Sequence, residues 1–320
     1  MSTNPDSNTP ENDCLPLSPN NTSDVNTEIS EELKEVRKRH PQQFMCSYLN
    51  INSFRYKLCS IKELLTTNTV DMLIIAETKL DDTFTNSQFE VDNYHLWRAD
   101  RSSHGGGILV YLRSDLACDR KSKLECQFIE SVFVEINFNK DKKFLVSGLY
   151  RPPTMSDEQF TKDFNKTFDK ILMSYENIII LGDLNYNMMN KDKCVHLQTM
   201  CDIFDLENLV KSETCFTKDA PATLLDVILT NKSNLCQNVT NFSIGLTDVY
   251  NMVSVQIKGN IPKIDKSFIT YRSYKNFDSE KYFHDLKQID FNFIDSAENV
   301  DIAYENFEMS YLEVINKHIP

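Results

Sequence analysis

Short continuous runs of apolar residues recur along this chain and predict buried strands. The clearest run covers residues 178–181, which are Ile-Ile-Ile-Leu, and it ends at Gly182 followed by Asp183. Similar runs begin near residue 44, and no repeat period connects them. The predicted strands cover residues 44–51, 72–76, 108–112, 128–138, 143–150, 178–183, 224–229 and 252–257.

Segments with helical spacing of apolar residues lie between several of these strands. The spacing predicts helices over residues 56–65, 157–175 and 194–206, and Ser156 is a suitable N-cap for the second. Strands dominate and helices are interspersed, which indicates an α/β fold. We therefore expect a four-layer sandwich of two mostly antiparallel β-sheets flanked by helices, with a helical C-terminal extension.

The composition changes at both ends of the chain. Residues 1–40 are polar and acidic, so we expect a disordered arm that cannot bury enough surface to offset its ordering entropy. Residues 41–258 form the predicted folded domain. From Gly259 onward a linker containing Pro262 leads into segments with helical spacing, so residues 259–320 are interpreted as a linker and a helical segment.

The net charge of −13 is concentrated at the ends of the chain. Residues 1–36 carry eight acids and one lysine and contribute −7, and residues 259–320 carry eleven acids and seven bases and contribute −4. The intervening residues carry only −2, so a phosphate-bearing substrate is electrostatically acceptable there.

The nine cysteines include no Cys-x-x-Cys pair, and their number is odd. This usage is typical of free thiols in a reducing compartment. The N-terminus carries no basic-then-apolar signal, and no apolar run approaches the length of a membrane span. We therefore expect an intracellular protein, nuclear or cytoplasmic, that is not secreted and does not enter a membrane.

Polar side chains that suit phosphodiester chemistry recur where the predicted strands end. Turn preferences explain one or two such residues, but not an acid, amide or phenol at the end of so many strands. Mg²⁺ prefers oxygen ligands, a further carboxylate must activate the attacking water, and neutral donors must hold the phosphate. The pattern therefore favours metal-assisted cleavage of a phosphodiester. The residues concerned are Asn50, Asn52, Glu77, Tyr150, Asp183, Asn185, Asp226 and Asp248.

Six short motifs carry a resemblance to a known family. They are Leu49-Asn50-Ile51-Asn52-Ser53, Ala76-Glu77-Thr78-Lys79, Gly105-Gly106-Gly107-Ile108-Leu109-Val110-Tyr111, Gly148-Leu149-Tyr150-Arg151-Pro152-Pro153, Leu181-Gly182-Asp183-Leu184-Asn185 and Leu225-Asp226-Val227-Ile228-Leu229. In this order they resemble the endonuclease/exonuclease/phosphatase superfamily, and more narrowly the endonuclease domain of non-LTR (LINE-type) retrotransposons. The resemblance covers about residues 43–258. Residues 268–287 resemble the connector before the reverse transcriptase in those elements, and no polymerase follows in this sequence.

The resemblance implies a metal and phosphate site at the ends of the earlier strands. Glu77 would bind Mg²⁺, and Asn50 and Asn52 would lie near the metal and the phosphate. Tyr150 would donate a hydrogen bond to a phosphate oxygen. The implied cofactor is therefore Mg²⁺, and the implied substrate is DNA.

The later strands supply the implied catalytic residues. Asp183 would act on the attacking water, and Asn185 would position the phosphate. Asp226 would orient a catalytic histidine, and Asp248 would lie beside that histidine on the metal side.

This chain departs from the family at the catalytic histidine. Residues 245–251 are Gly-Leu-Thr-Asp-Val-Tyr-Asn, so Tyr250 occupies the nearest register and Val249 the alternative one. A tyrosine, with a pKa near 10, stays a neutral phenol at neutral pH and cannot supply an imidazolium beside the phosphate. Loss of such a group commonly costs about 10² to 10⁴ in rate, so we expect weak activity.

Three functions remain open on the sequence alone. The first is a Mg²⁺-dependent endonuclease that derives from a retroelement and nicks DNA, weakened by the replacement of histidine with Tyr250. The second is a catalytically inactive remnant or a nucleic-acid-binding module of the same fold. The third is hydrolysis of a small phosphate ester or lipid head group, since this superfamily hosts those activities too. We infer no obligate protein partner.

Overall fold

The chain divides into two compact units, Met1–Lys263 and Ile264–Pro320. Most of the expected N-terminal arm, residues 1–32, lies outside the residues that the structure describes. None of the described helices combines the length and the apolar character that crossing a lipid bilayer requires. The residues that the computed structural model describes are 33–139, 142–262, 272, 274 and 277–319.

The described structure includes a helix before the expected boundary at residue 40. Residues 33–39 are helical, and Leu33 is buried. The Arg37 guanidinium pairs with the buried Asp71 carboxylate and donates to the Gln43 carbonyl at 2.8 Å. The expectation of a disordered arm up to residue 40 is therefore wrong for residues 33–39, because these contacts anchor a short helix to the sheet.

The first sheet contains six strands and lies in the first unit. They are β1 (Phe44–Asn50), β2 (Met72–Ala76), β3 (Tyr94–Ala99), β4 (Ile108–Arg113), β11 (Cys236–Phe242) and β12 (Met252–Ile257). Their order across the sheet is β11-β12-β1-β2-β4-β3. β1 and β2 run parallel, and the other neighbours are antiparallel.

The second sheet also contains six strands. They are β5 (Ala117–Arg120), β6 (Glu130–Asn139), β7 (Lys142–Tyr150), β8 (Ile178–Asp183), β9 (Glu207–Asn208) and β10 (Asp226–Thr230). Their order is β5-β6-β7-β8-β10-β9. Only the β7–β8 pair is parallel, so both sheets are mostly antiparallel, as expected.

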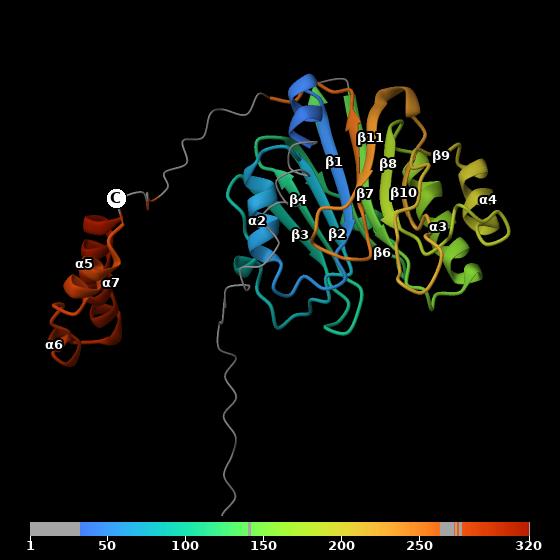
Figure 1. Cartoon of the computed structure of the whole chain (residues 1–320). Helices are drawn as coiled ribbons and strands as arrows, with labels where there is room; N and C mark the ends of the chain where they lie inside the picture. Colours follow the sequence, from blue (N-terminus) through green and yellow to red (C-terminus); the bar gives the residue numbers. More distant parts are fainter. Residues whose placement is uncertain (1–32, 140–141, 263–271, 273, 275–276, 320) are drawn as a thin grey trace, which may run out of the picture. The chain divides into compact units, whose positions relative to one another are not determined.

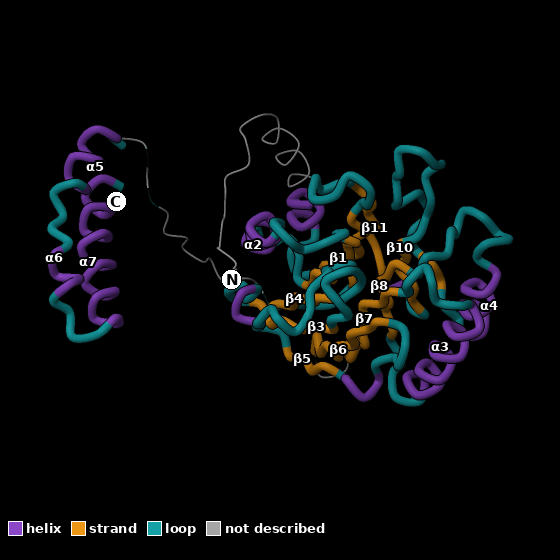
Figure 2. Tube along the Cα trace, turned by 90° about the horizontal axis from the view of Figure 1, so that it is seen from below, coloured by secondary structure: helices purple, strands orange, loops and turns teal. Residues whose placement is uncertain are grey.

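The two sheets pack face to face, and helices cover their outer faces (Figures 1 and 2). The sheets approach so closely at Gly148 that an added Cβ would lie 2.4 Å from Ile74 Cγ2. Ile61 of helix α2 (Leu58–Thr66) joins the apolar cluster on the outside of the first sheet. Phe164 of helix α3 (Asp157–Leu172) joins the core of the second sheet, beside helix α4 (Val195–Ile203). The predicted four-layer sandwich is confirmed.

All eight predicted strands are present, with ends shifted by at most two residues. Ser156 caps α3 as predicted, since its hydroxyl accepts from the Gln159 N–H at 3.2 Å. The four strands that the pattern missed, β3, β5, β9 and β11, are the outermost strands of the two sheets. Their residues are half-exposed, so they lack the continuous apolar runs that mark buried strands. Short 3₁₀ turns cover Asn86–Gln88, Ser122–Leu124 and Ser233–Leu235.

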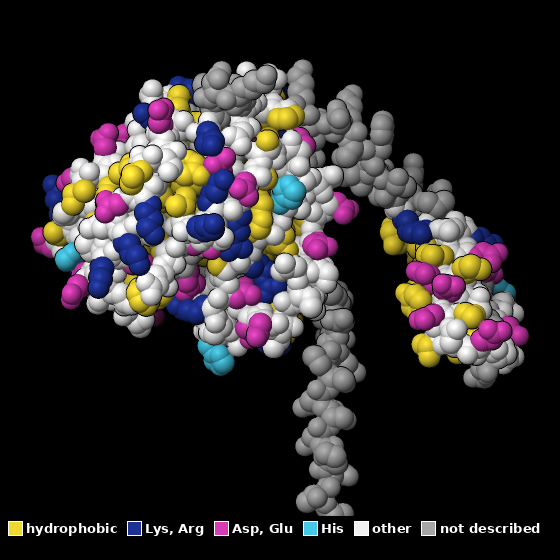
Figure 3. Space-filling view, turned by 180° about the vertical axis from the view of Figure 1, so that it is seen from behind, with side chains coloured by type: hydrophobic (Ala, Val, Ile, Leu, Met, Phe, Trp, Pro, Cys, Tyr) yellow, Lys and Arg dark blue, Asp and Glu magenta, His cyan; other side chains and the backbone are white. Residues whose placement is uncertain are grey.

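The described part of the second unit contains the helices α5 (Ser279–Leu286), α6 (Asn292–Asp295) and α7 (Val300–His318). Asn299 caps α7, and His318 of α7 contacts Asp285 of α5 through Nε2 and Oδ2 at 2.8 Å. Neither α5 nor α7 contains a buried residue, and acidic and apolar side chains share their surface (Figure 3). The predicted helical extension is confirmed. Of the expected connector, residues 268–271, 273 and 275–276 lie outside the described residues.

Candidate active site

Strand ends from both sheets lie at one end of the first unit. The β1–β2 register aligns Asn50 with the last residue of β2, directly before Glu77. In the second sheet Tyr150 is aligned with Asp183, and Asp183 faces Asp226 across β8 and β10. The order of the strands therefore gathers side chains that are far apart in the sequence. We call this region the polar edge, defined by Asn50, Glu77, Tyr150, Asp183 and Asp226.

Asp183 lies at the centre of a buried hydrogen-bond chain. Its Oδ2 accepts from Asn50 Nδ2 at 2.9 Å, and its Oδ1 accepts from the Asn185 N–H at 3.0 Å. The Asn185 amide donates in turn to the Arg151 carbonyl at 2.7 Å. The Asp183 N–H donates to the Tyr48 hydroxyl at 2.8 Å, which links β8 to the first sheet. Asn50, Asp183 and Asn185 are thus brought together, and the orientation of the Asp183 carboxylate is fixed.

A glycine turn and a phenol hold Glu77 at the polar edge. The Tyr150 hydroxyl donates to the Glu77 carboxylate, and the Gly106 N–H donates to Glu77 Oε2 at 3.4 Å. The Gly106 carbonyl accepts from the Lys79 N–H at 2.8 Å, which ties the turn to the segment after β2. Burial and the adjacent Glu77 carboxylate raise the pKa of Tyr150, so this phenol remains a neutral hydrogen-bond donor.

Unusual backbone conformations concentrate beside the polar edge. Ten non-glycine residues of the described chain have positive φ, and five of them follow the strand ends at this edge. Glu77 has φ 55° and Asn185 has φ 52°. Left-handed backbone is unfavourable for non-glycine residues, and such strain persists where the surrounding structure enforces it, often at functional sites. The five residues are Asn52, Ser53, Glu77, Lys79 and Asn185.

Asp226 is a fully buried carboxylate without a hydrogen-bond partner for either oxygen among the described residues. Its N–H donates to the Thr214 hydroxyl at 3.0 Å, so the backbone N–H is satisfied while no described residue hydrogen-bonds to the carboxylate. Burial and the charge of Asp183 raise the pKa of Asp226 well above its usual range, although the adjacent Thr214 hydroxyl opposes this shift. Burial also raises the pKa of Asp183, to about 6, although hydrogen bonds from Asn50 and Asn185 oppose this shift.

We expect the substitution Asp226→Asn to stabilise the protein increasingly as the pH rises from about 4 to about 8. Because folding raises the pKa of Asp226, the protonated carboxyl adds to the free energy of unfolding below the unfolded pKa of about 3.9. This contribution is lost as the pH rises through the pKa that Asp226 has in the folded state. The asparagine variant does not titrate, so its free energy of unfolding should exceed that of the wild type by about 1 to 3 kcal/mol at pH 8.

Urea unfolding in EDTA at pH 4.5, 6 and 8 measures this difference. The matched control is Asp192→Asn, which removes an exposed carboxylate outside the polar edge. An advantage of Asp226→Asn that stays constant with pH would contradict the proposed cause.

The segment that carries Tyr250 lies beside the strand end of Asp226. Tyr250 forms an isolated backbone bridge with Cys215, and the Asn251 N–H donates to the Thr214 carbonyl at 2.9 Å. Burial raises the pKa of the Tyr250 phenol, and the negative charges of Asp183 and Asp226 raise it further. Tyr250 therefore lies close enough to Asp183 and Asp226 for their charges to affect its phenol, but no hydrogen bond among the described residues connects its hydroxyl to Asp226.

Asn52 and Asp248 lie in a more basic part of the same region. The Asn52 amide oxygen accepts from Lys79 Nζ at 2.7 Å. Burial and the charge of Lys79 lower the pKa of Lys57, with burial having the larger effect. The negative charge of the exposed Asp248 opposes this shift. Two lysines, an amide and a carboxylate are thus close to one another, although neither Asn52 nor Asp248 is hydrogen-bonded to Glu77 among the described residues.

No pattern in the residues marks Glu130, which holds the glycine turn beside Glu77 from the second sheet. Glu130 begins β6, its carboxylate accepts from the Gly107 N–H, and it pairs with Arg101 at 2.9 Å. The Arg101 guanidinium lies 5.8 Å from the centre of the Tyr150 ring. Burial raises the pKa of Glu130, and the charge of Glu77 adds to this shift. These contacts depend on the pairing of β6 with β7, which the residue pattern does not specify.

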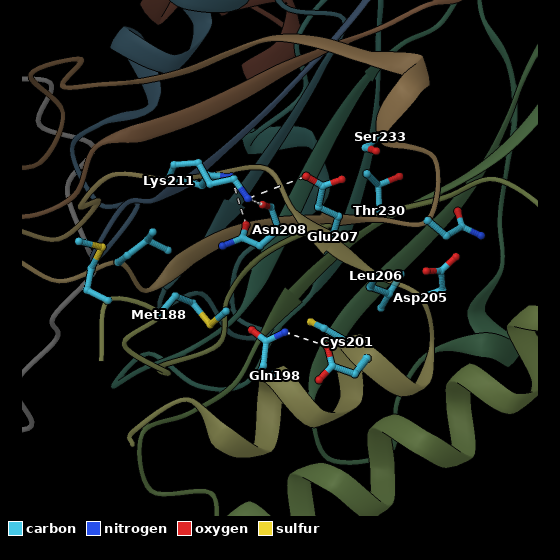
Figure 4. Close-up of a pocket in the computed structure, with 15 residues that line it drawn as sticks. Met188, Gln198, Cys201, Asp205, Leu206, Glu207, Asn208, Lys211, Thr230 and Ser233 are labelled. Carbon is cyan, nitrogen blue, oxygen red and sulfur yellow. Dashed lines mark hydrogen bonds and ion pairs between the residues drawn. The ribbon is translucent and has the colours of Figure 1, made fainter. Parts of the chain in front are cut away.

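A pocket of about 660 Å³ lies elsewhere, between α4, the outermost strand β9 and its neighbour β10 (Figure 4). Its lining includes Gln198, Glu207 and Lys211, and Glu207 and Lys211 form an ion pair at 3.9 Å. None of the predicted site residues lines this pocket. The hydrogen-bond chain at the polar edge, rather than the size of a cavity, therefore identifies the candidate site.

Several solved structures share this fold. The endonuclease domain of TRAS1, a telomere-specific non-LTR retrotransposon, matches with a TM-score of 0.56 and 13% identity over 67% of this chain and 98% of that chain. The AP endonuclease LMAP from Leishmania major matches with a TM-score of 0.58 and 12% identity over 68% and 88%. The 3'-5' exonuclease NExo from Neisseria meningitidis matches with a TM-score of 0.53 and 15% identity over 67% and 99%. At these identities the matches establish the fold alone.

Comparison with sequence families gives a more specific result. No curated protein matches this chain. The model of the Endonuclease/Exonuclease/phosphatase family matches residues 48–240, which is more than half of the chain and includes both strands that flank Asp183. The match agrees with the two-sheet sandwich and with the resemblance carried by the six motifs. The chain therefore belongs to the Endonuclease/Exonuclease/phosphatase family.

Proposed function

We propose that this protein is a metal-dependent DNA endonuclease of retroelement origin whose activity is low because it lacks the catalytic histidine. One observation carries the proposal: Asp183 is oriented by Asn50 and Asn185 at the same edge that presents Glu77 and Tyr150. An acid that is buried and also accepts two fixed hydrogen bonds suits activation of a water molecule. The retrotransposon-like motifs and the helical second unit, interpreted as a connector, support the retroelement origin.

The donors at the polar edge fit Mg²⁺. No group of three or more His, Cys, Asp or Glu side chains in the described part of the chain could hold a metal without other ligands. Mg²⁺ prefers oxygen ligands and keeps several waters, so Glu77 with the nearby amides of Asn50 and Asn52 suffices. Asn52 would first have to release Lys79, and Asp248 would lie on the metal side. When bound, the ion would neutralise charge on the phosphate.

The remaining side chains supply positioning and proton transfer. Asp183, with a pKa raised to about 6 chiefly by burial, is mostly ionised at neutral pH and basic enough to accept a proton from water. Tyr150 would turn its hydroxyl from Glu77 to a phosphate oxygen, and Asn185 would position the phosphate. These groups would stabilise the charge that develops as the phosphodiester is attacked.

The incomplete part of the site is next to Asp226. The buried Asp226 carboxylate has no hydrogen-bond partner among the described residues. Residues 249–251 are Val, Tyr and Asn, so they supply no imidazole. Burial and the charges of Asp183 and Asp226 raise the pKa of Tyr250, so its phenol remains neutral. This observation favours a second candidate function, namely a module that binds nucleic acid without turnover.

A plasmid-nicking assay tests the proposed function. We expect slow conversion of supercoiled plasmid to the nicked form in 5 to 10 mM Mg²⁺, that is, at roughly the concentrations at which weak Mg²⁺ sites fill, and none in EDTA. Binding of DNA without nicking would favour the module. Hydrolysis of inositol phosphates in preference to DNA would favour a small phosphate ester as the substrate, and metal-independent nicking would contradict the proposal.

A further inference from the structure

Tyr56 occupies a turn position that does not suit a tyrosine. The Lys57 N–H donates to the Phe54 carbonyl at 3.0 Å, so residues 54–57 form a β-turn with Tyr56 as its third residue. Tyr56 has φ 65°, a conformation that turns of this kind normally reserve for glycine or asparagine. A bulky side chain at this position is locally unfavourable.

Packing does not compensate for this conformation. The Tyr56 residue is 82% exposed, which is the highest value for any aromatic residue in the described chain. The guanidinium of the exposed Arg55 lies over the Tyr56 ring, 5.2 Å from its centre. Arg55 and Tyr56 together therefore present a cation and an aromatic face to solvent. A residue that breaks a local rule without a visible gain in packing points to function.

The turn is fixed next to the polar edge. The Ser53 N–H donates to the Glu77 carbonyl at 2.7 Å, and the Phe54 N–H donates to the Thr78 carbonyl at 2.9 Å. Phe54 is buried, with its ring perpendicular to that of Phe89 at 5.4 Å. Backbone bonds and a buried anchor therefore attach the exposed Tyr56 directly to the segment that carries Glu77.

The surroundings of the turn suit a polyanion. Lys57 follows Tyr56 directly and donates from Nζ to the Ile51 carbonyl at 2.6 Å. Lys79 lies close enough to lower the pKa of Lys57. An exposed aromatic ring flanked by an arginine and lysines is the combination with which proteins bind unpaired nucleotides, because the ring stacks on a base while the cations neutralise phosphates.

We propose that Tyr56 stacks on an unpaired nucleobase next to the phosphate to be cleaved, with Arg55 on an adjacent phosphate. The proposal rests on the proposed function, since it assigns the form of nucleic acid that this site prefers. Bases in a continuous duplex present only their edges, so a stacking contact favours DNA with at least one unpaired nucleotide. Tyr56 is thus a specificity-determining residue for distorted or single-stranded segments.

The test measures the stability of the full chain and its binding of fluorescein-labelled DNA in EDTA, where cleavage does not interfere. Tyr56→Gly should raise Tm by about 2 to 4 °C, because glycine suits the turn. The same variant should weaken binding to a duplex with one unpaired nucleotide by about tenfold or more. Tyr56→Trp should retain tight binding. The control Met173→Ala, which alters a side chain that is 88% exposed after α3, should change neither quantity.

The salt dependence of binding distinguishes stacking from charge. Arg55→Ala should reduce the slope of log Kd against log salt by about 1, whereas Tyr56→Gly should leave the slope unchanged. The proposal is overturned if Tyr56→Gly binds like the wild type, or if its Tm falls, since that would give the ring a packing role. If the wild-type protein binds no DNA at all, the proposed DNA substrate is wrong as well. Failure of the proposed function is therefore distinguishable from failure of the Tyr56 proposal alone, in which the wild type binds DNA but Tyr56→Gly does not weaken binding.

Discussion

Replacing Asp183 with asparagine should lower Mg²⁺-dependent DNA nicking by about 10² to 10⁴. The side chain is fully buried, accepts hydrogen bonds from Asn50 and the Asn185 N–H, and has a pKa raised to about 6, mainly by burial. Asparagine has nearly the same shape but cannot accept a proton from water. The loss should therefore appear in kcat rather than in KM, because the interaction is made in the transition state.

Initial rates on a fluorescent oligonucleotide in Mg²⁺ measure the effect, with thermal unfolding as a check on the fold. The matched control is again Asp192→Asn, an exposed position outside the polar edge. If Asp183→Asn retains a rate within about tenfold of the wild type, the residue does not activate water.

Replacing Tyr250 with histidine should raise nicking by up to about 10², the lower part of the range for a general acid or base. The charges of Asp183 and Asp226 reach the Tyr250 phenol and raise its pKa, and the Asp226 carboxylate has no hydrogen-bond partner among the described residues. An imidazole at this position can donate to Asp226 and present a second N–H to the phosphate. The two buried acids favour the charged imidazolium, which tyrosine cannot replace at neutral pH.

Two further variants make this result specific. Val249→His tests the alternative register, and Tyr250→Phe removes the hydroxyl without adding a titratable group. The gain from Tyr250→His should disappear when Asp226→Asn is added, because the new imidazole then loses its partner. Equal rates for Tyr250→His and the wild type would mean that the polar edge has another defect or that the histidine register is wrong.

The central strands of the fold could be predicted because burial on both faces requires continuous apolar sequence. The segment 178–183 and the segment 72–76 therefore appear at the same positions in the structure. The outermost strands β3 and β11 could not be predicted in this way, because one edge of each strand is free and their side chains are half-exposed. Such strands are defined by the neighbour with which they pair, and pairing is a property of the whole sheet.

The site was predictable in its residue types but not in its contacts. Acids, amides and a phenol at strand ends indicated a shared edge, and the structure brings Asn50, Asp183 and Asn185 into one hydrogen-bond chain. Strand-end residues can be recognised from composition alone. Which of them contact one another depends on the order of strands across both sheets, and nothing in the local sequence specifies that order.

By itself, the sequence determined the buried strands, the family and the absence of histidine from residues 245–251. Tertiary structure alone decided that Asp226 lies opposite Asp183 with no hydrogen-bond partner for its carboxylate in the described part of the chain. It also decided that Glu130 supports the glycine turn beside Glu77 and that Lys79 donates to the Asn52 amide oxygen. The physical reason is that local sequence fixes which surfaces must be buried. Register and sheet packing then decide which polar atoms meet there, and whether each one finds a partner.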